Sequence, residues 1–200
     1  MLAFDTATEV ATSALVDGGE VLAERASRAR TLLEDVDALL RQGGAHPRDL
    51  DALAVGIGPG SFTGVRIGLA AARALGLAWQ AQVVGYPTLA LVAAMAQAED
   101  PKPVTVCMTG GHGEWFVQDF GAGLAPEMEA ASLSPAQAVE RGAHPLVTGS
   151  QADALVHARE TGEALPLLPD ARRWDLLPVS LLTATPGPIY GRPPDARLPA

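Results

Sequence analysis

Asp5 is a candidate functional carboxylate, because it stands beside Thr6 where an apolar stretch, 1–6, runs into a polar turn. A carboxylate at the end of a strand can hold a hydrated Mg²⁺ ion or position a phosphate group. Local spacing favours a simpler interpretation, an aspartate that bonds the backbone of its own turn. A phosphate site would need a second acidic glycine turn opposite Asp5. The corresponding turn carries Gly110 and Gly111 but no carboxylate.

A second chemical candidate is the glycine-rich run 56–68, Gly-Ile-Gly-Pro-Gly-Ser-Phe-Thr-Gly-Val-Arg-Ile-Gly. An apolar stretch enters it and an alanine-rich stretch, 70–78, leaves it, so the pattern predicts a strand, a tight turn and a helix. The helix N-terminus should be closely approached by another group, either an anion attracted by free N–H groups or another protein. The run lacks the lysine of a Walker loop and the spacing of a nucleophile elbow. Ser61 is therefore predicted to cap the helix.

Metal and thiol chemistry find little support in the residue pattern. No pair of the four histidines has a spacing that would place both on one helical turn. The single cysteine, Cys107, excludes an internal disulfide and lies in the apolar run 104–108, as is typical of a buried structural thiol. We expect neither a metal site nor a catalytic cysteine.

Composition narrows the class of partners. The formal net charge is −9 and no run of Lys or Arg occurs, which argues against a large nucleic-acid surface of the chain's own. If the protein acts near RNA, a partner is expected to hold the RNA. No apolar run reaches the roughly 20 residues of a membrane span, and no basic, apolar leader opens the chain. We expect a soluble cytoplasmic protein that does not contact a membrane.

The predicted elements place these residues on a mixed sheet. Hairpin-linked strands are expected at 1–6, 10–16 and 20–25, and a helix is expected at 32–42. A strand at 53–57, the helix after the glycine run and a strand at 82–85 follow. The last helix of this part runs from Thr88 to Gln97, with Thr88 as its cap. A strand meander followed by alternating helices and strands is typical of an α/β sheet with helices packed on its faces.

The chain divides into two parts in this interpretation. Residues 1–99 form the first subdomain, and a charged, proline-containing stretch, 99–103, marks the boundary. Residues 104–185 repeat the pattern in abridged form, as a hairpin, a helix beginning at Ser134-Pro135, a strand at 146–148 and a helix at 151–157. Residues 186–200 are too rich in proline for regular structure.

The helix after the glycine run carries a stripe of small residues. Gly64, Gly68 and Ala72 recur every four residues, and apolar residues such as Val65 and Leu69 occupy much of the remaining circumference. Such a helix is either buried on all sides or meets a partner helix with its outer face. The residue pattern alone leaves both readings open.

Several segments resemble the TsaB family, also called YeaZ. The resemblance is carried by 2–8, the helix 32–42, the long motif 53–68, Glu114-Trp115-Phe116 and the C-terminal 189–196, so it spans essentially the whole chain. It implies an actin-like ATPase-domain fold of two ribonuclease-H-like subdomains. Each would hold a mixed five-stranded type of sheet flanked by helices, and the second subdomain would be reduced.

The resemblance also implies a role in tRNA modification. TsaB-like proteins are non-catalytic partners of the synthase subunit TsaD, which forms threonylcarbamoyladenosine in tRNA, and the ATPase TsaE joins the assembly. TsaD holds a metal through paired histidines, which this chain lacks. We expect a scaffold with no catalytic residue and no required cofactor. ATP or ADP and Mg would bind at the level of the complex. The scaffold would meet tRNA only through the complex and could form a homodimer when alone.

The resemblance and the small-residue stripe together predict a partner interface on the helices at about 30–42 and 62–77. Its expected residues are Leu33, Val36, Leu40, Ser61, Phe62, Thr63, Gly64, Val65, Arg66, Gly68, Leu69 and Ala72. A vestigial nucleotide site is expected at Asp5, Thr6, Gly110 and Gly111.

Two departures from the family pattern and one alternative function accompany this prediction. The chain has Ala29-Arg30-Thr31 where family members often have histidine-serine, and Thr109-Gly110-Gly111-His112 where they often have Asp-Ala-Arg. The alternative is an independent ATP-dependent phosphotransferase or nucleotide-binding protein that uses Asp5.

Overall fold

The first sheet begins with three strands joined by hairpins, β1 (Leu2–Asp5), β2 (Ala11–Asp17) and β3 (Glu20–Ser27), in a computed structural model that describes residues 1–191. Two more strands, β4 (Ala52–Gly56) and β5 (Gln82–Tyr86), complete it in the order β3-β2-β1-β4-β5. β1 pairs antiparallel with β2 and parallel with β4. The mixed sheet predicted for the first subdomain is therefore confirmed.

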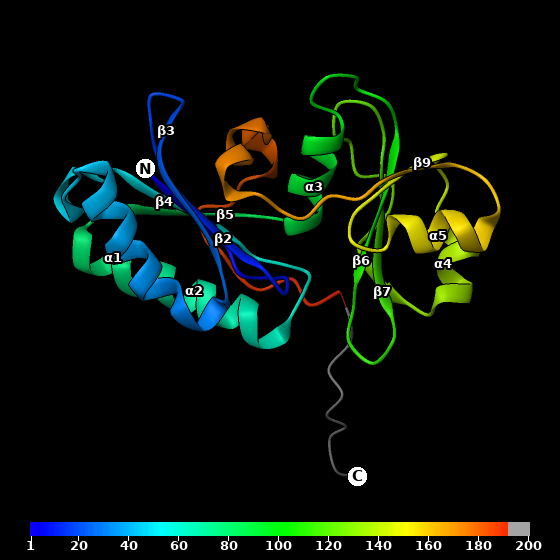
Figure 1. Ribbon diagram of the computed structural model, residues 1–200, viewed down its shortest axis with the longest axis horizontal. Helices are drawn as coiled ribbons and strands as arrows, with labels where there is room; N and C mark the ends of the chain where they lie inside the picture. Colours follow the sequence, from blue (N-terminus) through cyan, green and yellow to red (C-terminus); the bar gives the residue numbers. More distant parts are fainter. Residues whose placement is uncertain (192–200) are drawn as a thin grey trace, which may run out of the picture.

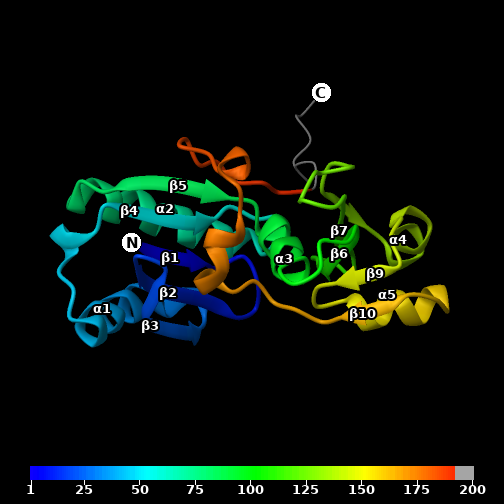
Figure 2. The same ribbon diagram turned by 90° about the horizontal axis from the view of Figure 1, so that it is seen from above.

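Two helices cover one face of this sheet, α1 (Leu32–Gly43) and α2 (Phe62–Trp79) (Figures 1 and 2). Their apolar sides pack on Leu2, Phe4 and Val55 in the first hydrophobic core. α1 ends at Gly44, whose left-handed φ of 64° suits a residue without a Cβ. Short 3₁₀ helices, η1 (Ala29–Thr31) and η2 (Pro47–Asp49), flank α1.

The second sheet has five strands and repeats the topology of the first. They are β6 (Val104–Thr109), β7 (Trp115–Phe120), β8 (Ala131–Leu133), β9 (Leu146–Thr148) and β10 (Glu163–Leu165), in the order β10-β9-β6-β7-β8. The sequence does not predict β8 or β10, because each has one large apolar side chain, whereas the equally short β9, which is predicted, has Leu146 and Val147 in succession. The second subdomain is thus reduced in strand length rather than in strand number.

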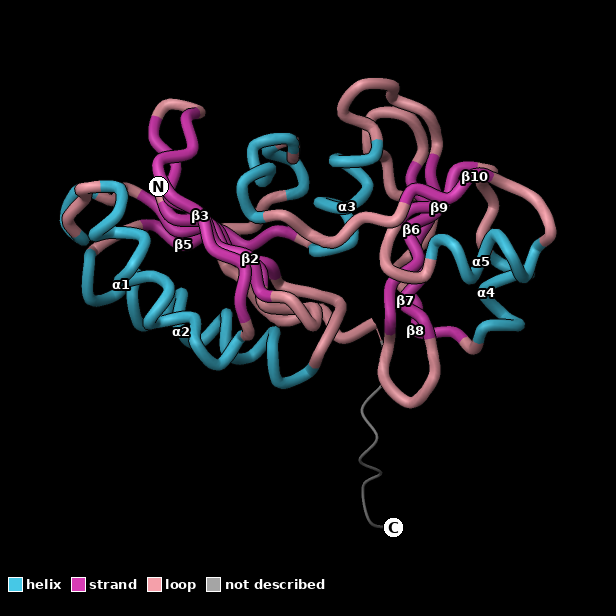
Figure 3. The backbone as a smooth tube through the Cα atoms, in the orientation of Figure 1, coloured by secondary structure: helices cyan, strands magenta, loops and turns pink. Residues whose placement is uncertain are grey.

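The helices of the second subdomain are short and lie beside the second sheet, on the side remote from the first subdomain (Figure 3). They are α4 (Pro135–Arg141) and α5 (Ala152–Arg159). Ser134 caps α4 as predicted, because its hydroxyl accepts a bond from the Gln137 N–H. Among residues 1–191, the structure contains no helix long and apolar enough to cross a membrane.

α3 (Thr88–Ala96) lies between the two sheets and is almost wholly buried (Figure 1). Its core includes Ala3 and Tyr86 from the first sheet and Val104 and Phe116 from the second, so one hydrophobic cluster joins the subdomains. The prediction that Thr88 caps this helix is wrong. Pro87 occupies the cap position, and the Thr88 hydroxyl is engaged by Asp5 and Gly58 instead.

The last described part of the chain, 166–191, returns from the second subdomain across the first, and we call it the C-terminal strap (Figure 2). It contains η3 (Ala171–Leu176) and η4 (Val179–Leu181). The expected irregular segment 186–200 lies partly outside the described residues; its described part, 186–191, has neither helix nor strand.

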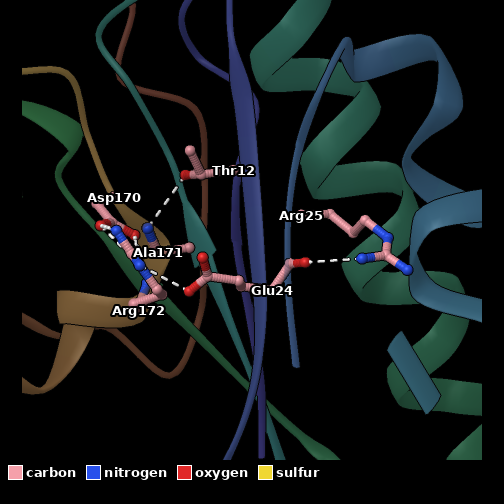
Figure 4. A network of polar contacts seen from close by, with 6 residues as sticks. All are labelled: Thr12, Glu24, Arg25, Asp170, Ala171 and Arg172. Carbon is pink, nitrogen blue, oxygen red and sulfur yellow. Dashed lines mark hydrogen bonds and ion pairs between the residues drawn. The ribbon is translucent and has the colours of Figure 1, made fainter. Parts of the chain in front are cut away.

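A polar network fastens the C-terminal strap to β2 and β3 (Figure 4). The Thr12 hydroxyl donates to the Pro169 carbonyl at 3.0 Å and accepts from the Ala171 N–H at 3.1 Å. Arg172 forms ion pairs with Glu24 at 2.7 Å and with Asp170 at 2.6 Å. The strap thereby covers the face of the first sheet opposite α1 and α2.

Candidate functional site

Asp5 lies at the end of β1 with a fully buried side chain. Its Oδ1 accepts a hydrogen bond from the Ala7 N–H at 2.8 Å, and its Oδ2 accepts one from the Thr88 hydroxyl at 2.8 Å. The turn interpretation of Asp5 is confirmed by the first bond, while the second ties β1 to the start of α3. Both carboxylate oxygens are therefore engaged within the protein.

The glycine-rich run closes over this carboxylate. A Cβ at Gly56 would overlap Asp5 itself, and one at Gly60 would overlap the Ala7 carbonyl. The Ser61 N–H donates to the same Ala7 carbonyl at 2.7 Å. The group that approaches the start of α2 is thus the turn between β1 and β2, and the glycines are required because that turn lies so close.

Burial determines the electrostatics of this position. Removal from water disfavours the ionised carboxylate and raises the pKa of Asp5 from 3.8 to about 6, against the opposing effect of its bonds to Ala7 and Thr88. Burial also raises the pKa of the neighbouring Tyr86 hydroxyl well above its usual value. A hydrated cation or a phosphate cannot reach Asp5 unless the glycine-rich run moves away.

Thr6 is buried too, and its hydroxyl donates to the Gly64 carbonyl at 2.7 Å inside α2. Gly110 and Gly111 lie in the turn between β6 and β7, where the Gly110 N–H donates to the Glu114 carbonyl. Among residues 1–191, no hydrogen bond joins this turn to Asp5 or Thr6. Asp5 and Thr6 are thus held within the first subdomain and Gly110 within the second, and the nucleotide site expected at the four residues stays a prediction.

The small-residue stripe of α2 faces the chain's own sheet. A Cβ at Gly64 would overlap the Thr6 carbonyl, and one at Gly68 would overlap the Thr6 hydroxyl. The structure therefore contradicts a partner helix along this stripe. The residues of the expected interface that lie in the core instead are Val36, Leu40, Gly64, Val65, Gly68, Leu69 and Ala72. Close helix–sheet approach explains the small side chains.

The other predicted interface residues lie on the surface of α1 and at the start of α2. Leu33 is 60% exposed and Phe62 is 55% exposed, while Thr63 and Arg66 are exposed as well. Ser61 is exposed and caps α2 as predicted, since its Oγ accepts from the Gly64 N–H. These five positions remain available to a partner.

Sequence reasoning missed two members of this surface. Leu77 is 84% exposed near the end of α2, and an isolated leucine in an apolar helix gives no sign of its direction. Tyr190 of the strap packs on Phe62 at a ring-centroid separation of 5.4 Å and accepts a bond from Arg66 Nε at 3.1 Å. The Arg66 guanidinium lies 3.6 Å from the Phe62 ring centre, which holds it in a fixed direction.

Metal and thiol groups contribute no further site in the described part of the chain. Across residues 1–191, no three His, Cys, Asp or Glu side chains gather in a way that could hold a metal ion. Cys107 is buried on β6 as predicted, and burial raises the pKa of its thiol to about 12. A protonated, enclosed thiol is a poor nucleophile.

Comparison with known proteins agrees with this architecture. The family model described as TsaD, tRNA N6-adenosine threonylcarbamoyltransferase, matches residues 7–156. The tRNA threonylcarbamoyladenosine biosynthesis protein TsaB of Escherichia coli (strain K12) is 43% identical over 97 residues, which cover 46% of this chain. The match spans 42% of the length of that relative.

Solved structures extend the similarity to most of the chain. YeaZ from Pseudomonas aeruginosa is 28% identical and has a TM-score of 0.71, with 86% of each chain covered. The ethanolamine utilization protein EutJ from Carboxydothermus hydrogenoformans is 12% identical, has a TM-score of 0.51 and covers 93% of this chain and 89% of its own, which shows a shared fold alone. The actin-like α/β fold is confirmed. The chain belongs to the tRNA N6-adenosine threonylcarbamoyltransferase (TsaD) family, within which it is similar to the TsaB (YeaZ) proteins.

Proposed function

We propose that this protein is a cytoplasmic, non-catalytic partner of the synthase subunit TsaD in the formation of threonylcarbamoyladenosine in tRNA. Exposed apolar side chains on α1 and α2 carry this proposal. Leu33, Phe62 and Leu77 lie on the sides of these helices that face away from the sheet. Large apolar side chains gathered on neighbouring helices are typical of a protein–protein interface.

The enclosed Asp5 supports the non-catalytic part of the proposal. A phosphotransferase would need its carboxylate exposed to a metal ion or a phosphate, whereas both oxygens of Asp5 are bonded inside the fold. No observation in the described residues favours the phosphotransferase alternative. The chain would accordingly contact other components only within the complex, namely ATP or ADP with Mg, the ATPase TsaE and tRNA.

The proposed interface consists of Leu33, Phe62, Thr63, Arg66 and Leu77, with Ser61 at its margin. The contacts of Arg66 with the Phe62 and Tyr190 rings fix an aromatic and cationic group at the start of α2. Such a preformed group loses little side-chain entropy on binding, which favours its use as an anchor. The same face could pair with a second copy when TsaD is absent.

Light scattering of the purified chain mixed with TsaD tests the proposal. The wild-type chain should form a complex with one copy of each protein, and Leu33→Asp should weaken it about tenfold or more. Val179→Asp is the matched control, because Val179 is 82% exposed on η4, away from α1 and α2. Failure to form a complex at micromolar concentrations, or equal binding by Leu33→Asp and the wild type, would overturn the proposal.

An activity assay separates the scaffold from the catalyst. Threonylcarbamoyladenosine in tRNA is measured with TsaD and TsaE present, with and without this chain. Asp5→Asn should support modification as well as the wild type does, provided that its melting curve shows a folded protein. A loss of modification by folded, TsaD-bound Asp5→Asn would indicate a chemical role for Asp5.

A further inference from the structure

The C-terminal strap covers only part of the edge of the first sheet, which is formed by β5. Gly85 of β5 donates to the Thr183 carbonyl at 2.8 Å, and Thr183 donates back to the Gly85 carbonyl at 2.9 Å. The C-terminal strap therefore contacts the edge of β5 through a single antiparallel β-bridge. Beyond Thr183 the strap leaves the edge, since the Thr185 N–H turns back to the Thr183 hydroxyl.

Val83 presents the next pair of backbone groups along this edge. In the parallel ladder with β4, Gln82 donates to Asp51 and the Tyr86 carbonyl accepts from Ile57, so the even-numbered residues of β5 bond inward. The N–H and C=O of Val83 point outward with those of Gly85. Within residues 1–191, neither backbone group of Val83 has a hydrogen-bond partner on that side.

A groove of about 620 Å³ opens along this part of the edge. β5 forms its floor, the last turns of α2 form one wall and the C-terminal strap forms the other. Its lining residues are Arg73, Gly76, Leu77, Ala81, Val83, Ala184, Thr185, Pro186 and Gly187. Arg73 Nη2 donates to the Pro186 carbonyl at 2.7 Å, which joins the two walls at one end of the groove.

The charge in the groove has one sign. Arg73 is the only ionisable residue among the lining side chains, and in the described residues it forms no ion pair. Its remaining guanidinium N–H groups can bind a carboxylate. Leu77 adds an exposed apolar side chain beside it. The groove thus offers an unpaired strand edge, a cation and an apolar surface together.

We propose that this groove binds an extended segment of another protein that carries a carboxylate side chain, by adding a strand to β5 beside Val83. The unpaired N–H and C=O require a partner with complementary backbone groups, and an extended strand supplies both. The strap already uses the same edge in this manner at Gly85. The site shares Leu77 with the proposed TsaD interface, but its strand edge at Val83 and its cation Arg73 are not part of that interface, so it goes beyond the proposed function.

The probes are short peptides of alternating valine and threonine that carry either one glutamate or one lysine. They are titrated into the full chain, whose backbone amides are observed by NMR. The glutamate peptides should shift the amides of Val83 and Leu77 and bind about tenfold more tightly than the lysine peptides. N-methylation of the peptide amides that face β5 should abolish the shifts. N-methylation on the other edge should leave them unchanged.

Two variants test the two parts of the site. Val83→Pro removes the outward N–H at an edge position where proline is compatible with a strand, and it should lose peptide binding while its melting curve shows a folded protein. Arg73→Met should erase the preference for glutamate over lysine. Arg141→Met is the matched control, because Arg141 is exposed at the end of α4 in the second subdomain, and it should bind the peptides as the wild type does.

Hydrogen exchange in the free chain tests whether the β5 edge is already occupied, for example by a second copy of this chain. The Val83 amide should exchange rapidly while the Gly85 amide is protected. Protection of Val83 without added peptide would overturn the proposal, with a doubled mass by light scattering identifying a second copy as the occupant. Absence of shifts at Val83 with every peptide at millimolar concentration would overturn it as well.

Discussion

The Thr88 hydroxyl donates a 2.8 Å hydrogen bond to Asp5 Oδ2 and accepts a 3.2 Å bond from the Gly58 N–H. One hydroxyl thereby joins the end of β1, the glycine-rich run and the first turn of α3. Because all three segments are buried there, the contact closes the space in which a phosphate would have to bind Asp5. This relationship supports the proposed non-catalytic role, because both oxygens of Asp5 are bonded within the fold.

The buried carboxylate predicts a specific pH dependence of stability. The pKa of Asp5 rises from 3.8 to about 6 on folding, so the folded state holds the proton more tightly than the unfolded state does. The resulting stability is fully present below about pH 3.8 and is lost as the pH rises through about 6. It amounts to on the order of 3 kcal/mol.

Asp5→Asn should remove this component, since its amide does not titrate. Urea unfolding of both proteins at several pH values, from about 4 to about 7, measures this component. As the pH rises, the free energy of unfolding of the wild type should fall relative to that of Asp5→Asn. Asp153→Asn, on the surface of α5, is the control and should follow the wild type. Parallel curves for the wild type and Asp5→Asn would contradict the prediction.

The inward direction of the small-residue stripe predicts that Gly64→Ala destabilises the protein. Helix propensity alone would favour alanine by up to about 1 kcal/mol. The added Cβ would overlap the Thr6 carbonyl, so we expect a net loss of about 2 kcal/mol or more. Urea denaturation measures the change.

Ala74→Leu provides the comparison on the same helix, because Ala74 is exposed. Its stability should stay within about 0.5 kcal/mol of the wild type. If Ala74→Leu were the damaging substitution and Gly64→Ala were neutral, α2 would present its small residues outward and this account of the helix would fail.

The network at the C-terminal strap predicts unequal contributions from its two parts. Thr12→Val leaves the Ala171 N–H and the Pro169 carbonyl without their bonds, so a loss of about 1–3 kcal/mol is expected. Arg172→Gln removes exposed ion pairs and should cost about 1 kcal/mol or less. Thermal unfolding of both variants gives the ranking. A larger effect of Arg172→Gln would show that the ion pairs, and not the threonine, hold the strap.

The single thiol provides a direct probe of the second sheet. Burial and a pKa of about 12 should keep Cys107 from reacting with a thiol reagent at pH 8 until the protein unfolds. Reaction rates followed across a urea titration should therefore rise with the unfolded fraction. Ala122→Cys, which adds an exposed thiol, should react at once in the folded state. Rapid modification of folded wild type would contradict the enclosed position of Cys107.

Much of the fold was predictable from local pattern. The glycine turn that joins β2 and β3, the helical period of α1 and the glycine-rich turn before α2 are strong local signals. β8 and β10 escaped prediction because each has a single large apolar side chain and forms at an edge that the longer strands of the sheet provide. Thr88 was assigned to a cap because threonine favours caps locally, whereas the tertiary fold places Asp5 within reach of its hydroxyl.

The sequence by itself determined that Ser61 caps α2, that Cys107 is buried and that Asp5 bonds its own turn, since each depends on neighbours within a few residues. Only the tertiary structure decided which side of α2 is outside. A stripe of glycine and alanine permits close approach of any backbone, and its sequence cannot distinguish a partner helix from the chain's own turn. Here the turn at Thr6 and Ala7 occupies that space, so the larger side chains Phe62, Arg66 and Leu77 are left facing outward.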